Sequence, residues 1–591
     1  MPPSVTTRSY DNARSGTNSH ETVLTPDAVR TKGIEKLFSL QLAGDARGIE
    51  AQPLVLPGVT LADGQSHDVI YLADMANQLW AFDADTGARL WTRTLGPPVT
   101  GTEPIDHYLI NDHWGILSTP VIDAAAGIMY LVAWISPDRS AEKAQHFCYA
   151  VSVRDGTDVH PPVNLEGATY QAGHGAPEQL FASAGRKQRA ALLLTKVDGH
   201  QTVFIGFGSL QETSATSRGW IIACATDPLG VTAAWASTAK GFGGGIWQAG
   251  SGLVADAKGF IYVMTGNGTF DGQVDFGESF VKLRYAPPDG TTAGSLSVTD
   301  WWTPFSDALR VGPQAHVAVR ADRPLATNFR LETAAMGENP WADMDLGSAG
   351  PLLVEQFGVV IGAGKDGIAY VLDNDDMGKT AAADLADPAR NYQKLKAPPV
   401  FFTYFPPGLD PAPQDITTLN VWWGNQTHHL HGSSVFWDSP DLGPLVYCWG
   451  ENGNLRAWSL QQDGRLTYQA CSAEWASANA PDDPGSNTPK GGMPGGMISL
   501  SADGTTPHSG VVWALIPYAD ANVAPVNGRL LAYDATDFGT FGDGSKQLQV
   551  LWDSQDWNIQ FLFNKFNRPV VFNGKLIVPT YDDRVDVYGL A

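Results

Sequence analysis

A short unit of strands and turns recurs along the chain and constrains its fold more than any other feature. The clearest copy lies between Asp68 and Gly96, with an apolar strand at 69–74, a second strand at 78–83 and a third strand that opens on Trp91. Echoes of this unit follow at 148–151, 368–373, 455–458 and 530–533. Self-similarity built from strands, with no helical period, predicts a β-propeller of repeated antiparallel blades.

The strand clusters group into eight units of four strands. We expect these units to begin near positions 51, 117, 190, 245, 347, 431, 495 and 569. The last unit has only three strands after Asn567, and the stretch 36–42 near the N-terminus resembles an orphan fourth strand. Pairing that strand with 584–588 satisfies both exposed edges. The sequence therefore predicts an all-β fold, a single eight-bladed propeller over 1–591, with its last blade closed by an N-terminal strand.

Two stretches of the chain do not follow the blade pattern. The segments at about 301–345 and 376–427 are long, irregular and rich in proline. Long loops in a compact fold are usually functional or disordered, so we expect both to be excursions that roof the central funnel.

Trp91 and Trp552 each open the last strand of a repeat, which predicts that they pack between adjacent blades.

Composition narrows the classes of partner. The net charge is −24, and such an acidic surface disfavours a nucleic-acid partner. No stretch approaches the ~18 consecutive apolar residues of a membrane span. The four cysteines are far apart and predict free thiols rather than a redox or haem motif. The first residues do not resemble a signal peptide, so we expect a cytoplasmic protein, or a secreted or periplasmic one if the chain is a trimmed mature form.

The repeat and its tryptophan resemble the quinoprotein propellers, the PQQ-dependent alcohol dehydrogenases, over nearly the whole chain. The Gly-Gly-Gly-Ile-Trp stretch at 243–247 resembles the family segment that carries the tryptophan floor beneath the quinone, which implies this role for Trp247. The strand and Gly-Asn-Gly turn at 260–269 imply that Asn267 ligates a calcium ion. The segment 364–373 implies that Lys365 contacts the quinone carbonyls, and the segment 345–351 implies that Asp345 is the base.

The resemblance also implies PQQ and calcium as cofactors and an alcohol or sugar as substrate. Calcium prefers several hard oxygen ligands, so Asn267 and Asp345 need a further carboxylate, for which Glu212 is the best candidate. An even closer likeness is to orphan bacterial PQQ-like propellers, a branch with no assigned reaction. Its marks are the segments 10–14, 24–26, 345–348, 375–378 and 493–497.

The chain departs from these enzymes, and each site residue has a purely structural interpretation. It lacks the adjacent-cysteine pair that covers the quinone and any haem domain, and its interval from Asn267 to Asp345 is longer. Asn267 and Lys365 would also suit tight turns, Asp345 a turn cap, and Trp247 packing between blades. Both interpretations stay open at the level of sequence.

A histidine cluster forms a second group of candidate site residues. The stretch 428–431 reads His-His-Leu-His, and strand alternation would place His429 and His431 on one face. Two such imidazoles favour zinc or copper, with His107, His113 or His316 as a third ligand. An acid–base or substrate-contact role is the alternative.

Three functions therefore remain as hypotheses. The first is a PQQ- and calcium-dependent dehydrogenase. The second is a cofactor-free propeller that binds a glycan, a peptide or a partner protein. The third is a lyase, hydrolase or cyclase that uses histidines and carboxylates. All three predict a small-molecule or carbohydrate ligand, or a partner, at the central funnel. The first predicts that Trp247, Asn267, Asp345 and Lys365 converge at one end of it.

Overall fold

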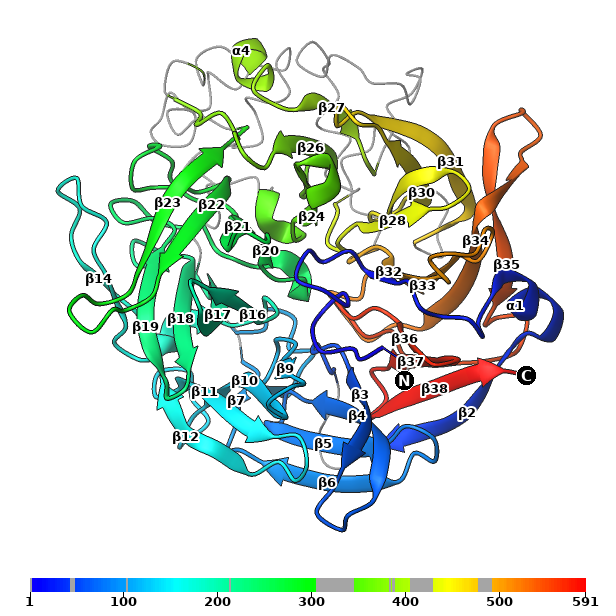
Figure 1. Cartoon of the computed structure of the whole chain (residues 1–591), viewed down its shortest axis with the longest axis horizontal. Coiled ribbons are helices and arrows are strands. Elements are labelled where there is room, and N and C mark those ends of the chain that lie inside the picture. The colour runs from blue at the N-terminus through cyan, green and yellow to red at the C-terminus, as the bar shows by residue number, and fades with distance from the viewer. Residues whose placement is uncertain are drawn as a thin grey trace.

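The computed structural model describes residues 3–42, 48–102, 105–211, 214–304, 345–381, 384, 388–403, 429–476 and 492–591. This part of the chain is mainly β, and its sheets follow one another around a common centre (Figure 1). Most of these strands form antiparallel meanders of four, because short apolar runs alternate with turns rich in Gly, Asp and Asn. The repeat therefore folds as a propeller blade.

The strands of the first half of the chain form four such sheets. They are β3 to β6 (Leu54–Thr60, Ser66–Ala73, Gln78–Asp83, Arg89–Thr94), β9 to β12 (Val121–Asp123, Ile128–Ile135, Gln145–Ser152, Asp158–Asn164), β16 to β19 (Leu193–Val197, His200–Ser209, Trp220–Thr226, Leu229–Ala236) and β20 to β23 (Val254–Ala255, Phe260–Met264, Phe280–Ala286, Ser295–Trp302).

The strands of the second half continue the pattern. They are β24 to β27 (Leu352–Val354, Val359–Ala363, Ile368–Asp373, Ala397–Phe401), β28 to β31 (Val435–Ser439, Gly443–Cys448, Asn454–Leu460, Leu466–Trp475), β32 to β35 (Met497–Ser501, Val511–Pro517, Gly528–Thr540, Lys546–Asp553) and β36 to β38 (Val570–Phe572, Lys575–Pro579, Arg584–Leu590) with β2 (Ile34–Gln41). A single residue pair, Cys471 with Gln547, links β31 to β35 at the rim.

Short elements complete the described chain. The strands are β1 (Thr17–Asn18), β7 (Val99–Thr100), β8 (His113–Trp114), β13 (Thr169–Tyr170), β14 (Gln179–Leu180) and β15 (Arg186–Lys187). The helical turns are α1 (Pro26–Lys32), η1 (Ser183–Gly185), η2 (Gln248–Gly250), η5 (Leu346–Ser348), η6 (Glu355–Phe357) and α4 (Pro388–Tyr392). No helix in the described ranges is both long enough and apolar enough to span a membrane.

The N-terminal strand closes the last sheet, as predicted. β2 pairs antiparallel with β38, with Lys36 opposite Tyr588 and Gln41 opposite Arg584, and the register shifts at Leu37. The first and last parts of the chain therefore lie side by side at one point of the ring (Figure 1).

The predicted excursions need correction at their edges. Trp301 and Trp302 belong to β23, so that sheet extends into the first predicted excursion. The second predicted excursion contains α4 and β27, and β27 is the fourth strand of its sheet because it pairs with β26. The proline at position 399 and the helix before it hid this strand. The remainder of both predicted loops, 305–344 and 404–428, lies outside the described residues.

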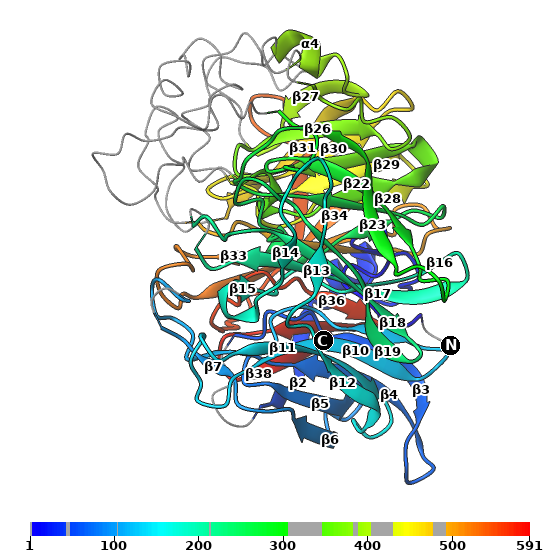
Figure 2. The ribbon, with the colours of Figure 1, turned by 90° about the vertical axis from the view of Figure 1, so that its left-hand side faces the viewer.

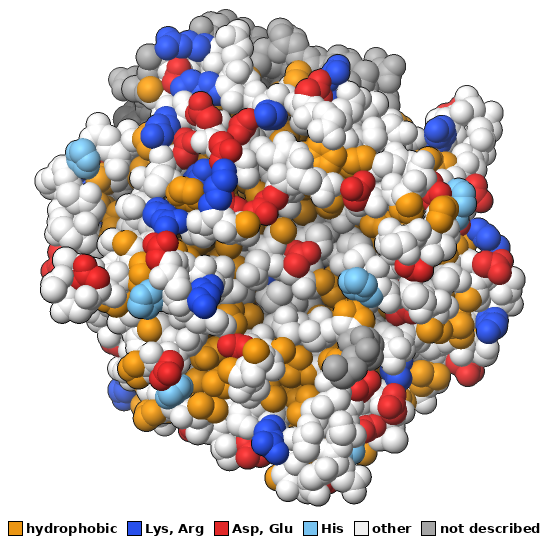
Figure 3. Space-filling model, in the orientation of Figure 1, with side chains coloured by type: hydrophobic (Ala, Val, Ile, Leu, Met, Phe, Trp, Pro, Cys, Tyr) orange, Lys and Arg blue, Asp and Glu red, His pale blue; other side chains and the backbone are white. Residues whose placement is uncertain are grey.

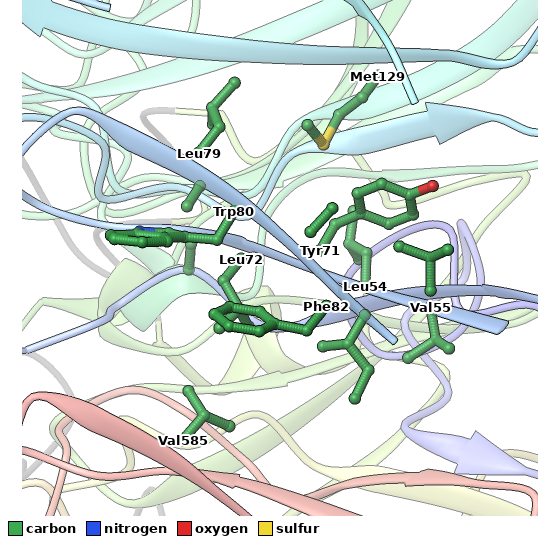
Figure 4. Close-up of a cluster of buried hydrophobic side chains, with 14 of the residues drawn as sticks. Leu54, Val55, Tyr71, Leu72, Leu79, Trp80, Phe82, Met129 and Val585 are labelled. Atoms are coloured by element: carbon green, nitrogen blue, oxygen red, sulfur yellow. The ribbon is translucent and has the colours of Figure 1, made fainter. Parts of the chain in front are cut away.

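The cores lie between neighbouring sheets. Side chains of β3 to β5 such as Tyr71, Leu79 and Trp80 lie between Met129 of the next sheet and Val585 of the last one (Figure 4). The outer strands β12, β19 and β23 follow each other along the rim (Figure 2). Each sheet thus buries both of its faces against its neighbours.

Both tryptophans predicted to pack between blades do so. The Trp91 indole donates to the carbonyl oxygen of Val153 in the next sheet at 3.2 Å, and the side chain is half-buried. Trp552 is 3% exposed and packs in one apolar cluster with Val571 and Tyr588 of the following sheet. These contacts confirm the prediction.

The segment 5–18 lies at the centre of the ring and touches the first strand of each four-stranded sheet (Figure 1). It includes Tyr10, Asn12 and Arg14, which lie in the segment 10–14 named in the sequence analysis. Its hydrogen bonds join Val5 to Val55, Thr6 to Ile122, Asn12 to Leu194 and Ala255, Ala13 to Leu353, Ser15 to Phe436, Gly16 to Leu500 and Tyr10 to Val571. The segment therefore ties the inner strands together, a role that the sequence did not reveal.

On the face drawn in Figure 3, acidic and basic side chains are interspersed rather than gathered into one patch. The excess of 62 acidic over 38 basic residues is thus not concentrated at a single place on that face.

Candidate functional site

The candidate site residues occupy two kinds of connection. Asn267, Lys365 and Glu451 lie in links between the second and third strands of their sheets. Trp247, Asp345 and the histidines at 429–431 precede the first strands of theirs. In a four-stranded antiparallel meander, both kinds of connection lie at the same end of the strands. The repeat thus gathers side chains from distant parts of the sequence on one face of the ring.

Asp345 lies at the centre of the first group of residues. Its Oδ2 is 2.8 Å from Nζ of Lys365, and its Oδ1 accepts the backbone N–H of Asn267 at 2.9 Å. The backbone N–H of Lys365 also donates to the carbonyl oxygen of Asp345 at 3.1 Å. The side chains of Asp345 and Lys365 are only 5% and 13% exposed. Three segments separated by up to 98 positions, from Asn267 to Lys365, thus meet at one carboxylate.

Glycines make this approach possible. A Cβ atom on Gly266 would lie 2.1 Å from Oδ1 of Asp345, and one on Gly364 would lie 2.5 Å from the Asp345 carbonyl oxygen. Any side chain at either position would push the carboxylate segment away. The glycines beside Asn267 and Lys365 are therefore required by close packing.

Trp247 lies next to this group. A Cβ on Gly208 would come within 2.6–2.8 Å of three atoms of the indole, and one on Gly245 would lie 2.7 Å from its Nε1. The carbonyl oxygen of Gly245 accepts the N–H of Gly266, which connects the indole to the Asp345 group. The indole is half-buried. The structure thus brings Trp247, Asn267, Asp345 and Lys365 into one neighbourhood, whereas Glu212 lies outside the described residues.

The donor set fits a hard cation and a flat anionic ligand. Asn267 and Asp345 are 4% exposed each and offer an amide and carboxylate oxygens, which calcium prefers. Lys365 adds a positive charge and Trp247 a planar surface. A cavity of about 660 Å³ is lined by Arg139, Arg186, Ser209 and Gln211, among others, and its lining includes none of the four residues of this group. Its volume is typical of small-molecule sites.

His429, His431 and Glu451 form a second group. Nε2 of His431 is 2.9 Å from Oε1 of Glu451, and Nδ1 of His429 is 3.8 Å from Oε2. The sequence suggested His107, His113 or His316 as the third partner of the two histidines. The carboxylate of Glu451 takes that place in the described part of the chain, whereas His107 and His113 are not in the group. His316 lies outside the described residues.

The two groups are neighbours. The backbone N–H of Leu430 donates to the carbonyl oxygen of Gly364 at 3.2 Å, so the histidine segment runs beside the Lys365 turn. Burial raises the pKa of Glu451 to about 7, and the positive charges of His429 and Lys365 oppose this shift while Asp520 adds to it. An electrostatic interaction between Lys365 and Glu451 therefore connects the groups.

Buried cations lie elsewhere on the same set of connections. Arg189 pairs with Glu50 at 2.8 Å, and its guanidinium stacks 4.6 Å above the ring of Phe566. Burial, aided by the charge of Arg189, lowers the pKa of Lys187 to about 7. The ring centre is thus a polar environment of paired charges rather than an apolar core.

Sequence reasoning missed Glu451, although a signal was present. The turn Gly450-Glu451-Asn452-Gly453 occupies the same place in its sheet as Gly364-Lys365-Asp366-Gly367 does in the preceding one. Alignment of the repeats by their turns, rather than by their strands, would have identified Glu451 as the counterpart of Lys365.

Comparisons with known proteins establish the fold. No family model and no curated protein matches the chain. Among solved structures, it resembles the quinohemoprotein alcohol dehydrogenase from Comamonas testosteroni, with a TM-score of 0.52 and 16% identity over 100% of this chain and 80% of that one. A europium-containing methanol dehydrogenase gives 0.49 at 13% identity over 100% and 98% of the two chains. BamB from Moraxella catarrhalis gives 0.30 at 10% over 94% and 99%. The likeness to the first of these structures shows a β-propeller fold and, at 16% identity, no activity.

Proposed function

We propose that this protein is an eight-bladed propeller of the quinoprotein dehydrogenase type, which uses PQQ and calcium to oxidise an alcohol or sugar. The observation that carries the proposal is the placement of the Asp345 carboxylate. It lies between the ammonium group of Lys365 at 2.8 Å and the backbone N–H of Asn267 at 2.9 Å, with Trp247 beside them. These are the residue types that alcohol oxidation by a quinone requires, gathered from different blades.

Each residue has a defined task. Asn267 and Asp345 would hold the cation, with Glu212 as a proposed third ligand, and the Trp247 indole would support the flat cofactor. When bound, PQQ supplies the two-electron oxidant, and the calcium ion makes its carbonyl more electrophilic.

Asp345 is the residue that moves the proton. Its carboxylate accepts hydrogen bonds from Lys365 and from Asn267, and both donors favour the ionised form. An ionised carboxylate can accept the hydroxyl proton of the substrate. The positive charge of Lys365 would then favour loss of this proton to solvent, which returns Asp345 to the carboxylate form.

The test is reconstitution of the purified protein with PQQ and calcium. We expect the absorbance of PQQ to stay with the protein after desalting, and a redox dye to be reduced in the presence of alcohols or sugars. Asp345→Asn should retain PQQ and lose activity by about 10²–10⁴-fold, the range for a general base. Asp375→Asn is the control, because that carboxylate is exposed and pairs with Lys258 at the surface.

Failure has a clear form. If PQQ does not bind at micromolar concentration with calcium present, the dehydrogenase proposal is wrong. Binding of a sugar or peptide without PQQ would then favour the cofactor-free alternative, and the residues around Asp345 would be an inherited site put to another use.

A further inference from the structure

We propose that His429, His431 and Glu451 form a site for a first-row divalent metal ion, with Zn²⁺ the best match. This inference does not rest on the proposed dehydrogenase function, because none of the three residues belongs to the calcium and quinone group. It adds the carboxylate of Glu451 to the two histidines expected from the sequence.

The ligand atoms are already at metal-binding separations. One nitrogen from each imidazole and one oxygen of the carboxylate all lie within 4.8 Å of one another. Tetrahedral ligands at the usual ~2.0–2.1 Å from zinc lie about 3.3 Å apart. The observed contacts of 2.9 Å from His431 and 3.8 Å from His429 to Glu451 bracket that value. An ion fits between the three side chains with small rotations.

The backbone holds the ligands in place. Leu430, between the two histidines, is 1% exposed, and its carbonyl oxygen accepts the hydroxyl of Ser348 at 2.8 Å. The N–H of Glu451 donates to the carbonyl oxygen of His429 at 2.9 Å, which joins the ligand turn directly to the histidine segment. The two imidazoles that flank a buried leucine thus face one carboxylate. The backbone that carries the three ligands is already fixed before an ion binds.

The chemistry of the ligands selects the class of metal. Two imidazole nitrogens and one carboxylate oxygen suit zinc, copper, iron or nickel, whereas calcium and magnesium prefer sites made of oxygen alone. The side chains of His431 and Glu451 are 8% exposed and that of His429 is 20% exposed, so the site is shielded but reachable. The nearby positive charge of Lys365 is balanced by Asp345 at 2.8 Å. Three protein ligands leave a coordination position for water or a substrate, as catalytic zinc sites do.

The decisive measurement is a metal titration that needs neither PQQ nor turnover. Protein stripped with a chelator and dialysed should bind one equivalent of Co²⁺ with a visible d–d absorption band, and Zn²⁺ should abolish that band. Zn²⁺ should also raise the Tm of the stripped protein, because an ion that binds only the folded state stabilises it. Glu451→Gln and His431→Ala should each weaken Co²⁺ binding by more than about 100-fold, beyond the 10–100-fold typical of outer-shell changes.

The matched control is His508→Ala. The side chain of His508 is 72% exposed and 3.5 Å from Asp441, so its loss removes one imidazole without touching the site. This variant should keep the one-equivalent titration. His429→Gln serves as a further ligand variant if His431→Ala does not fold, since His429 is the most exposed ligand.

Two outcomes would overturn the site. One is the absence of a Co²⁺ band and of a Zn²⁺ shift in Tm for the wild-type protein, which would leave a hydrogen-bonded histidine–glutamate cluster. The other is equal binding by the wild type and by Glu451→Gln, which would place the metal elsewhere. Neither outcome bears on PQQ binding, so the two proposals fail separately.

Discussion

Buried aspartates in the turns show how single residues shape each blade. Asp74 accepts hydrogen bonds from the N–H groups of Ala76 and Gln78 and from the indole of Trp80. Asp366 does the same in another sheet for Ile368 and the hydroxyl of Tyr370. Burial raises the pKa of both carboxyl groups to about 6. The turn thus uses one buried carboxylate for structure, and in the second case Lys365 occupies the adjacent position.

The raised pKa of Asp74 predicts a pH-dependent effect of Asp74→Asn. Because the folded-state pKa lies above the unfolded value of 3.8, the folded state binds the proton more tightly, and this carboxyl lowers stability as pH rises from about 4 to about 6. Two pKa units correspond to about 3 kcal/mol. The free energy of unfolding of the variant, relative to wild type, should rise by up to that amount between pH 4 and pH 7.

The measurement for Asp74→Asn is urea denaturation at several pH values. The exposed Asp63→Asn is the control and should show a flat difference. A flat difference for Asp74→Asn as well would mean that its carboxyl titrates normally in the folded protein.

The two interblade tryptophans should differ in their contributions to stability. Trp552→Ala removes a side chain that is 3% exposed and should reduce the free energy of unfolding by about 3–5 kcal/mol. Trp91→Ala should cost less, because Trp91 is half-buried at the rim. The denaturant midpoints of both variants show which of them loses more stability. Equal losses would contradict this prediction.

At the scale of elements, β2 is the strand that joins the two ends of the chain. Its pairing with β38 covers an edge that the last sheet would otherwise expose. Leu40 on β2 is fully buried, whereas Leu37 is 44% exposed at the register shift. The strand therefore contributes packing on one face and edge protection along its length.

Leu40→Ala should destabilise the protein by about 2–5 kcal/mol, as truncation of a buried leucine does. Leu37→Ala changes the same side chain on the same strand and should cost less than about 1 kcal/mol, since surface changes are usually small. Thermal unfolding monitored by tryptophan fluorescence provides the comparison. Similar losses for both variants would show that β2 is not docked in this register.

At the scale of the whole molecule, the segment 5–18 stabilises the ring from its centre. Arg14 is fully buried and donates to the carbonyl oxygens of Leu192 and Leu253 and to the hydroxyl of Thr7. Other residues of the segment reach the first strand of each remaining sheet. A propeller without this segment would rely only on contacts between adjacent blades.

Deletion of residues 1–16 should lower the Tm and expose the inner strands to proteolysis, even though β2 still closes the ring. Deletion of residues 1–42 should be more severe, because it also removes β2 and leaves an open edge. Differential scanning calorimetry and limited proteolysis of both truncations are the measurements. An unchanged Tm after the shorter deletion would show that the central segment contributes no stability.

The sequence by itself determined the type of fold, because strand periodicity and turn residues recur locally in each repeat. The strand at 36–42 was identified because the last sheet lacked a fourth strand, and this deduction needs only a count of strands. The four residues from Trp247 to Lys365 were identified through their resemblance to a family, and the structure brings them together.

Only the tertiary structure decided which distant side chains meet. Glu451 meets His429 and His431 because the link between β29 and β30 lies at the same end of its sheet as the connection that enters β28. The role of Tyr10 to Arg14 is nonlocal, because these residues make hydrogen bonds with strands as far apart in the sequence as β16, β24 and β36. Local sequence sets which strands form, whereas the closure of the ring sets which side chains come into contact at its centre.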